Sequence, residues 1–179
     1  RAIGNANEVR ESVEVLAGGG PEDVVELTVA LAREMLALAG QPDADVAGHL
    51  RGGQAMDVWR RMIAAQGGDP DAPLPVPRES ETVVADRAGV LVDLPALPFG
   101  IAAWRLGAGR ARKEDPVAHA AGIDLHVRIG DRVSAGQPLY TLHADDPARF
   151  ARAHEALDGA LRIGADGDPV HDGGPLRIA

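Results

Sequence analysis

Four prolines within eight residues divide this chain more firmly than any other feature of its sequence. They are Pro70, Pro73, Pro75 and Pro77. Proline lacks a backbone N–H and fixes φ, so neither a helix interior nor a central strand can pass through this stretch. We therefore predict a crossing loop over residues 69–80, which separates a domain over residues 1–68 from a second domain over residues 81–179.

The sequence before the prolines has the periodicity of helices, and the sequence after them alternates between helices and strands. Apolar residues at spacings of three and four predict helices over residues 5–16, 21–39, 43–51 and 54–66. The second of these helices is apolar on nearly all sides, so we expect it to be largely buried. Beyond the loop, we expect two short strands within residues 81–92, further strands over 123–129 and 138–143, helices over 94–106 and 147–161, and a turn-rich tail. The predicted fold class is α+β.

The segment Gly130–Leu139 carries the pattern Gly-x-x-Val-x-x-Gly-x-Pro-Leu, with two turn glycines around an inward Val133. This pattern is typical of a half-barrel hairpin in biotinyl- and lipoyl-type folds, and it predicts a small barrel-sandwich or hammerhead-like domain. Carriers of that type present a modified lysine at an exposed hairpin tip. The single lysine here, Lys113, lies in an irregular loop, so the fold prediction stands without the carrier function.

Composition narrows the possible partners. The 27 acidic residues outnumber the 18 basic ones, and the net charge of −9 disfavours phosphate-backbone binding, so we predict no nucleic-acid partner. Aromatic residues make up 3% of the chain, too few for a base-stacking platform. Apolar runs such as 24–31 are far shorter than the ~20 residues that span a bilayer, so we predict no membrane partner. The absence of cysteine excludes disulfides and thiolate ligands.

Local motifs supply no catalytic group. Gly107-Ala108-Gly109 follows a predicted helix, whereas a dinucleotide-binding fingerprint follows a strand. The six histidines show no metal-ligand spacing, and we interpret each as a surface residue or a packed one with satisfied hydrogen bonds. Of the serines Ser12, Ser80 and Ser134, none lies in a nucleophile elbow or beside a base. We therefore predict no nucleophile.

Six stretches, in this order and spacing, resemble the C-terminal part of the thymidine and pyrimidine-nucleoside phosphorylase family. They are Arg1–Glu11, Gly20–Leu27, Ala64–Gly68, Leu106–Arg110, Ala121–Ile123 and Gly130–Leu139. The chain also begins without methionine, so we expect it to be a piece of a longer protein. The resemblance implies that residues 1–68 are the last helices of a large α/β domain and that residues 81–179 are its smaller C-terminal neighbour.

The activity implied by the resemblance is pentosyl transfer. Thymidine and phosphate would give thymine and 2-deoxyribose 1-phosphate, reversibly, in a cytoplasmic homodimer whose dimer-forming helices lie near the missing N-terminus. The family's Lys-His-Ser-Thr-Gly-Gly phosphate loop and its base-holding Arg, Ser and Lys do not occur here, so we expect them before Arg1 and assign no catalytic residue to this segment. No organic cofactor is implied.

One family site maps onto this chain, a monovalent cation site that would hold potassium. The resemblance assigns it the carbonyl of Ala2 and the side chain of Glu11. A carbonyl in the non-helical approach to a helix can point at an ion, and the carboxylate would supply the compensating charge.

Positive charge gathers in the loop Gly107–Lys113, where Arg110, Arg112 and Lys113 follow two glycines. We expect this loop to face the cleft between domains, and either to attract phosphate or to close against the large domain when substrates bind, with Arg110 as a candidate substrate-binding residue. The alternative is a solubilising loop.

Two other functions remain open at this point. The chain could be a non-enzymatic barrel-sandwich module that binds a partner or small ligand, or part of a phosphorylase that acts on nucleoside monophosphates. Residues encoded before Arg1 would separate these alternatives.

Overall fold

The computed structural model describes residues 1–171, which form two compact units. The first unit combines Arg1–Glu8 with the chain from Leu74 onward, and the second contains Val9–Pro73. The start of the chain thus folds with the sequence that follows the proline-rich loop. The predicted domain boundaries stay predictions, and the last eight residues of the predicted second domain, 172–179, lie outside the described residues.

The second unit is helical. It contains most of α1 (Ala6–Leu16), followed by α2 (Glu22–Leu38), α3 (Val46–Arg51) and α4 (Gln54–Ala65). The carboxylate of Asp45 caps α3 by accepting a hydrogen bond from the Gly48 N–H at 2.8 Å. The expectation that the helix over 21–39 is largely buried is wrong, since α2 has no buried residue and Leu38 is 90% exposed. Within this unit α2 packs against α3, which is too short to cover it.

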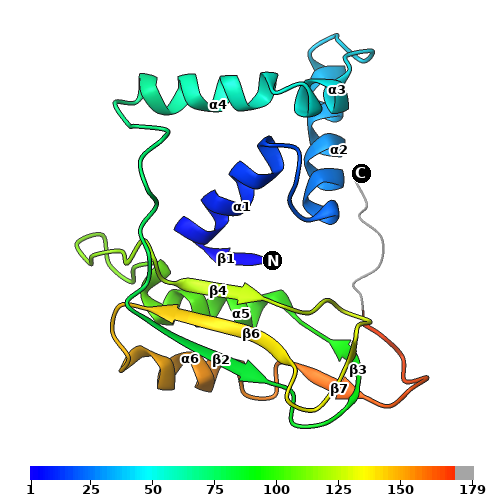
Figure 1. The fold of residues 1–179 in the computed structure, drawn as a ribbon, viewed down its shortest axis with the longest axis vertical. Helices are drawn as coiled ribbons and strands as arrows, with labels where there is room; N and C mark the ends of the chain where they lie inside the picture. Colours follow the sequence, from blue (N-terminus) through cyan, green and yellow to red (C-terminus); the bar gives the residue numbers. More distant parts are fainter. Residues whose placement is uncertain (172–179) are drawn as a thin grey trace. The chain divides into compact units, whose positions relative to one another are not determined.

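The first unit contains two small antiparallel sheets (Figure 1). The larger sheet has the order β1-β4-β6-β2, from β1 (Ala2–Gly4), β4 (Gly122–Leu125), β6 (Pro138–Ala144) and β2 (Glu79–Val84). The smaller sheet has the order β5-β3-β7, from β5 (Arg132–Val133), β3 (Gly89–Asp93) and β7 (Arg162–Gly164). Helices and antiparallel strands in one unit confirm the α+β prediction.

Two helical segments pack on the larger sheet and enclose the core. Helix α5 (Ala96–Ala103) continues into a π-helical turn, η1 (Trp104–Ala108), and α6 (Arg149–Leu157) packs against both. Phe99 from α5, Leu106 from η1, Ile123 from β4 and Leu142 from β6 are almost completely buried together. No helix within residues 1–171 is both long enough and apolar enough to cross a membrane.

The Gly130–Leu139 segment has the predicted local features but connects the two sheets. Gly130 and Gly136 adopt positive φ values of 87° and 82°, and Val133 between them is buried. Strand β5 pairs with β3, whereas β6 pairs with β4 and β2. The segment therefore crosses from the smaller sheet to the larger one instead of closing a two-stranded hairpin.

Tyr140 makes the stability of the core depend on pH. Its ring contacts Phe99 edge to face with centroids 5.5 Å apart, and burial, with the charge of Glu81 added, raises the pKa of its phenol. Tyrosine is neutral below its pKa, so this contribution to stability is present below the ordinary pKa of about 10 and is lost as pH rises through the raised native pKa. Because the chain has one tyrosine, absorbance titration should give a higher midpoint in the native protein than in denaturant. Equal midpoints would contradict this.

Candidate functional site

The turn from β1 into α1 depends on two facing glycines. Gly4 pairs with Gly122 in the β1–β4 register, and Gly4 has a φ of 154°. A Cβ on Gly4 would lie 2.7 Å from the Ala121 carbonyl oxygen, and a Cβ on Gly122 would lie 2.6 Å from the Ile3 carbonyl oxygen. Because these neighbours are backbone atoms, the close approach of the two strands requires glycine at both positions.

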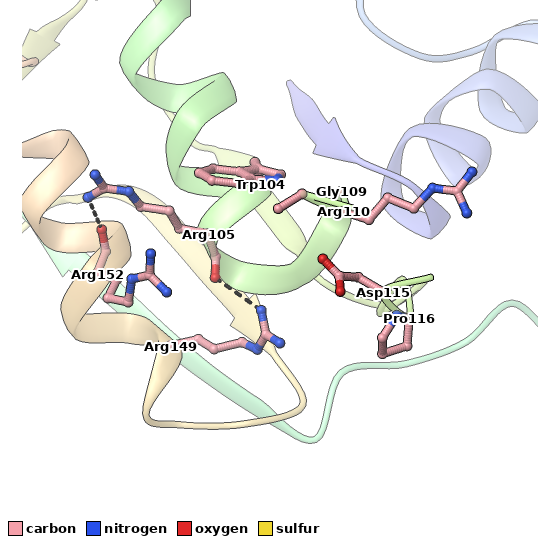
Figure 2. Close-up of a pocket in the computed structure, with 9 residues that line it drawn as sticks. Trp104, Arg105, Gly109, Arg110, Asp115, Pro116, Arg149 and Arg152 are labelled. Carbon is pink, nitrogen blue, oxygen red and sulfur yellow. Dashed lines mark hydrogen bonds between the residues drawn. The ribbon is translucent and has the colours of Figure 1, made fainter. Parts of the chain in front are cut away.

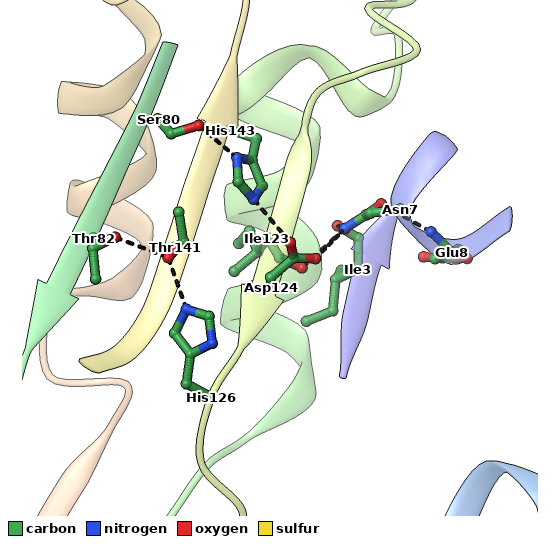
Figure 3. A network of polar contacts seen from close by, with 10 residues as sticks. All are labelled: Ile3, Asn7, Glu8, Ser80, Thr82, Ile123, Asp124, His126, Thr141 and His143. Carbon is green, nitrogen blue, oxygen red and sulfur yellow. Dashed lines mark hydrogen bonds and ion pairs between the residues drawn. The ribbon is translucent and has the colours of Figure 1, made fainter. Parts of the chain in front are cut away.

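Asn7 joins this turn to the larger sheet, and it is the one buried polar side chain among residues 1–171 (Figure 3). Its Nδ2 donates to the carbonyl oxygens of Ile3 at 3.3 Å and Ile123 at 3.1 Å, and to Asp124 Oδ1 at 3.1 Å. Its Oδ1 accepts from the Glu8 N–H at 3.0 Å. One amide group thus fixes the first turn of α1 onto β4.

A chain of polar contacts continues from Asp124 across the sheet (Figure 3). Asp124 Oδ2 lies 3.0 Å from His143 Nε2, and His143 Nδ1 lies 2.8 Å from Ser80 Oγ. The prediction that no serine lies beside a base is therefore wrong for Ser80. Ser80 and His143 are opposite each other in the β2–β6 register although 63 residues separate them in sequence.

The Ser80–His143–Asp124 chain does not have the arrangement of a hydrolase triad. In such a triad, Nε2 of the histidine faces the serine and Nδ1 faces the aspartate, and here the two ring nitrogens are exchanged. Asp124 also accepts from Asn7. These hydrogen bonds connect β2, β6 and β4 with the start of α1.

Ala2 and Glu11, the two predicted cation ligands, fall in different units. Ala2 lies in β1, an edge strand, opposite Asp124. The Leu125 N–H donates to the Arg1 carbonyl at 2.8 Å, and alternate residues of an antiparallel strand direct their backbone groups away from the partner strand. The Ala2 carbonyl therefore points out from the sheet edge. Glu11 is half-buried on α1, and the cation site stays a prediction.

A pocket of about 310 Å³ lies beside the Gly107–Lys113 loop in the first unit (Figure 2). It is lined by Trp104, Arg105, Gly109, Arg110, Ala111, Asp115, Pro116, Arg149 and Arg152. Sequence reasoning found the loop but missed the two arginines of α6. Their spacing of three residues, which puts both on one helix face, was the available signal.

Arg110, the candidate substrate-binding residue, lines this pocket from the loop. Figure 2 shows its guanidinium pointing away from those of Arg149 and Arg152. Its Nη1 donates to the Lys113 carbonyl at 3.1 Å, and the Arg112 N–H donates to Asp115 Oδ2 at 2.9 Å. The loop is thus held by its own hydrogen bonds, and the role of Arg110 stays a prediction.

Comparison with known proteins identifies the part of the chain that carries this pocket. Residues 90–164, from β3 to β7, match the pyrimidine nucleoside phosphorylase C-terminal domain family. The chain is 53% identical over 163 residues to thymidine phosphorylase of Mycobacterium tuberculosis. The matched region covers 91% of this chain and 38% of that protein.

Two more distant relatives carry a related name. Pyrimidine-nucleoside phosphorylase of Bacillus subtilis is 40% identical over 155 residues, covering 80% of this chain and 36% of that protein. Its Staphylococcus aureus counterpart is 35% identical over 156 residues, with 81% and 36% covered. The chain spans less than two fifths of the length of the curated relatives it matches. The chain therefore belongs to the thymidine and pyrimidine-nucleoside phosphorylase family and corresponds to the C-terminal part of its members.

Proposed function

We propose that the protein containing this chain is a pentosyltransferase that cleaves pyrimidine nucleosides with phosphate. Thymidine and phosphate would give thymine and 2-deoxyribose 1-phosphate. The observation that carries this proposal is the 53% identity over 163 residues to a protein named thymidine phosphorylase. The groups that bind phosphate and the base would lie in the part of the relatives that this chain does not match.

The test is product analysis with the full-length protein. Thymine should appear only when phosphate is present, together with an equal amount of phosphorylated sugar. A parallel assay with thymidine 5′-monophosphate in place of thymidine tests the rival enzymatic function. Faster cleavage of the nucleotide than of thymidine would identify a nucleoside-monophosphate phosphorylase. A protein that cleaves neither compound would support the third possibility, a binding module.

We also propose the finer architecture and assembly that the sequence predicts. A barrel-sandwich arrangement of the two small sheets is supported by the crossing of the Gly130–Leu139 segment between them. The resemblance supports a cytoplasmic homodimer with nucleoside and phosphate as its small-molecule partners. Sedimentation of the full-length protein would test the dimer.

Replacing Glu11 with glutamine in the full-length protein should weaken potassium binding and lower phosphorolysis without unfolding the chain. The Ala2 carbonyl would keep its dipole, but the ion would lose its neutralising charge. Turnover should be measured against potassium concentration, with Glu14→Gln on the same helix as the control. Unchanged potassium dependence in Glu11→Gln would make Glu11 an ordinary helical acid.

Replacing Arg110 with alanine should raise the apparent phosphate Michaelis constant of the full-length protein, more at low salt than at high salt. Steering by a positive loop is screened beyond about 10 Å at 0.1 M salt. Arg78→Ala, which removes an exposed arginine outside the pocket, is the control. If Arg110→Ala leaves the phosphate Michaelis constant unchanged at both ionic strengths, the loop is a solubilising surface loop and does not attract phosphate.

A further inference from the structure

The pocket beside η1 concentrates positive charge in an acidic protein. Four of its lining residues are arginines and one, Asp115, is acidic, whereas the whole chain has a net charge of −9. Figure 2 shows the guanidinium group of Arg149 between that of Arg152 and the carboxylate of Asp115, with the guanidinium group of Arg105 turned toward α6.

Two of these arginines are held in place by backbone atoms. Arg105 Nη1 donates to the Arg152 carbonyl at 2.7 Å and lies 3.5 Å from Glu155 Oε2, which joins η1 to α6. Arg149 Nη1 donates to the Arg105 carbonyl at 3.4 Å. A Cβ on Gly107 would lie 3.3 Å from Arg149 Nη1, so the glycine leaves room for this guanidinium.

Arg149 and Arg152 carry charge that the described chain does not neutralise. Within residues 1–171, no carboxylate forms an ion pair with either side chain, and Glu155 is directed to Arg105. The nearby Asp146 accepts from the Ala148 N–H at 3.0 Å. Both arginines also lie in the first turn of α6, which has no acidic residue. Cations at that end oppose the helix dipole, so their placement lowers the stability of the free protein.

Trp104 adds an aromatic surface to the same pocket. The residue is 41% exposed, and a Cβ on Gly109 would lie 2.9 Å from its Cδ1, so Gly109 permits the loop to pass close to the indole. Large exposed aromatic rings beside guanidinium groups provide a stacking face for a planar ligand. The volume of about 310 Å³ falls at the lower end of the range for small-molecule sites.

We propose that this pocket binds a nucleotide, with its phosphates on Arg149 and Arg152 and its base against Trp104. Guanidinium groups pair with phosphate oxygens through charge-assisted hydrogen bonds, and the two arginines lie on one face of α6, three residues apart. A bound phosphate offsets their mutual repulsion and the unfavourable dipole interaction. This site does not depend on the phosphorolysis proposed above.

The chain has two tryptophans, Trp59 and Trp104, so Trp104 is the one tryptophan of the 179-residue chain in a Trp59→Phe background. The probes are adenosine 5′-diphosphate, pyrophosphate and adenosine, none of which is a pyrimidine nucleoside. We expect the diphosphate to quench Trp104 saturably, pyrophosphate to bind more weakly, and adenosine alone to bind weakest. Arg152→Gln should weaken diphosphate binding roughly tenfold or more, whereas Arg78→Gln should change it less than about twofold.

Stability separates binding from a structural role. Arg152→Gln should leave the unfolding midpoint unchanged or raise it, because it removes a cation from the first turn of α6, while diphosphate binding is lost. A lowered midpoint with unchanged binding would overturn the proposal. The proposal would also be overturned if adenosine 5′-diphosphate did not quench Trp104, or if Arg78→Gln weakened diphosphate binding as much as Arg152→Gln does. Equal affinities for pyrophosphate and the diphosphate would overturn it as well. Binding that persists when the full-length protein lacks phosphorolysis supports this site independently of the proposed function.

Discussion

Replacing Gly4 with alanine is expected to lower the free energy of unfolding of the first unit by about 3–5 kcal/mol, the sum of backbone strain and overpacking. The new Cβ would lie 2.6 Å from Asn7 Oδ1, 2.7 Å from the Ala121 carbonyl oxygen and 2.9 Å from Gly122 Cα. Two of these three atoms belong to the backbone, so relief requires β1 to move away from β4. The residue would also keep a φ of 154°, which side-chain-bearing residues rarely adopt.

Urea unfolding followed by Trp104 fluorescence in the Trp59→Phe background reports on the first unit, since Trp59 belongs to the second. Gly130→Ala is the matched control, because Gly130 has a φ of 87° and a Cβ added there would have no neighbouring atom within 4 Å. The control should lose only about 1–2 kcal/mol, the strain of a left-handed residue. Equal losses in the two variants would contradict the packing of β1 against β4.

Replacing Asn7 with alanine is expected to lower the free energy of unfolding by about 2–4 kcal/mol, since the two N–H groups and the oxygen of its amide lose their buried partners, one of which is a carboxylate. Asp124 would lose one partner, and the carbonyl oxygens of Ile3 and Ile123 would each lose a donor. The Glu8 N–H would lose its acceptor in the first turn of α1.

Asn5→Ala provides the comparison for Asn7→Ala. Asn5 makes one hydrogen bond, from Nδ2 to the Ala108 carbonyl at 2.7 Å, so its loss should be about 1 kcal/mol. A double-mutant cycle between Asn7→Ala and Asp124→Asn would isolate the contact between them. Losses of the same size at Asn5 and Asn7 would show that the network around Asn7 does not anchor the start of α1.

The regular elements of this fold could be predicted from the sequence because their signals are local. The periodicity located α1, α4 and β6 within a few residues. The strands β1, β5 and β7 have two or three residues each, too few for a periodic pattern, and exist because longer strands pair with them.

The burial of α2 was mispredicted for a different reason. A helix that is apolar on nearly all sides needs neighbouring elements to bury it. The second unit does not provide them, and no residue of α2 is buried. Likewise, Ser80 and His143 meet through strand register, and Arg149 reaches the pocket through the packing of α6 on η1. Contacts between residues so distant in sequence have no local signature.

The most direct test of the central assignment compares two proteins in one assay. Thymine release in the presence of phosphate should be measured for the full-length protein and for the purified 179-residue chain. We expect phosphate-dependent release by the full-length protein and release no greater than the protein-free control by the chain alone, because the groups proposed to bind phosphate and the base lie outside this chain. Thymine release by the isolated chain, or none by the full-length protein, would contradict it.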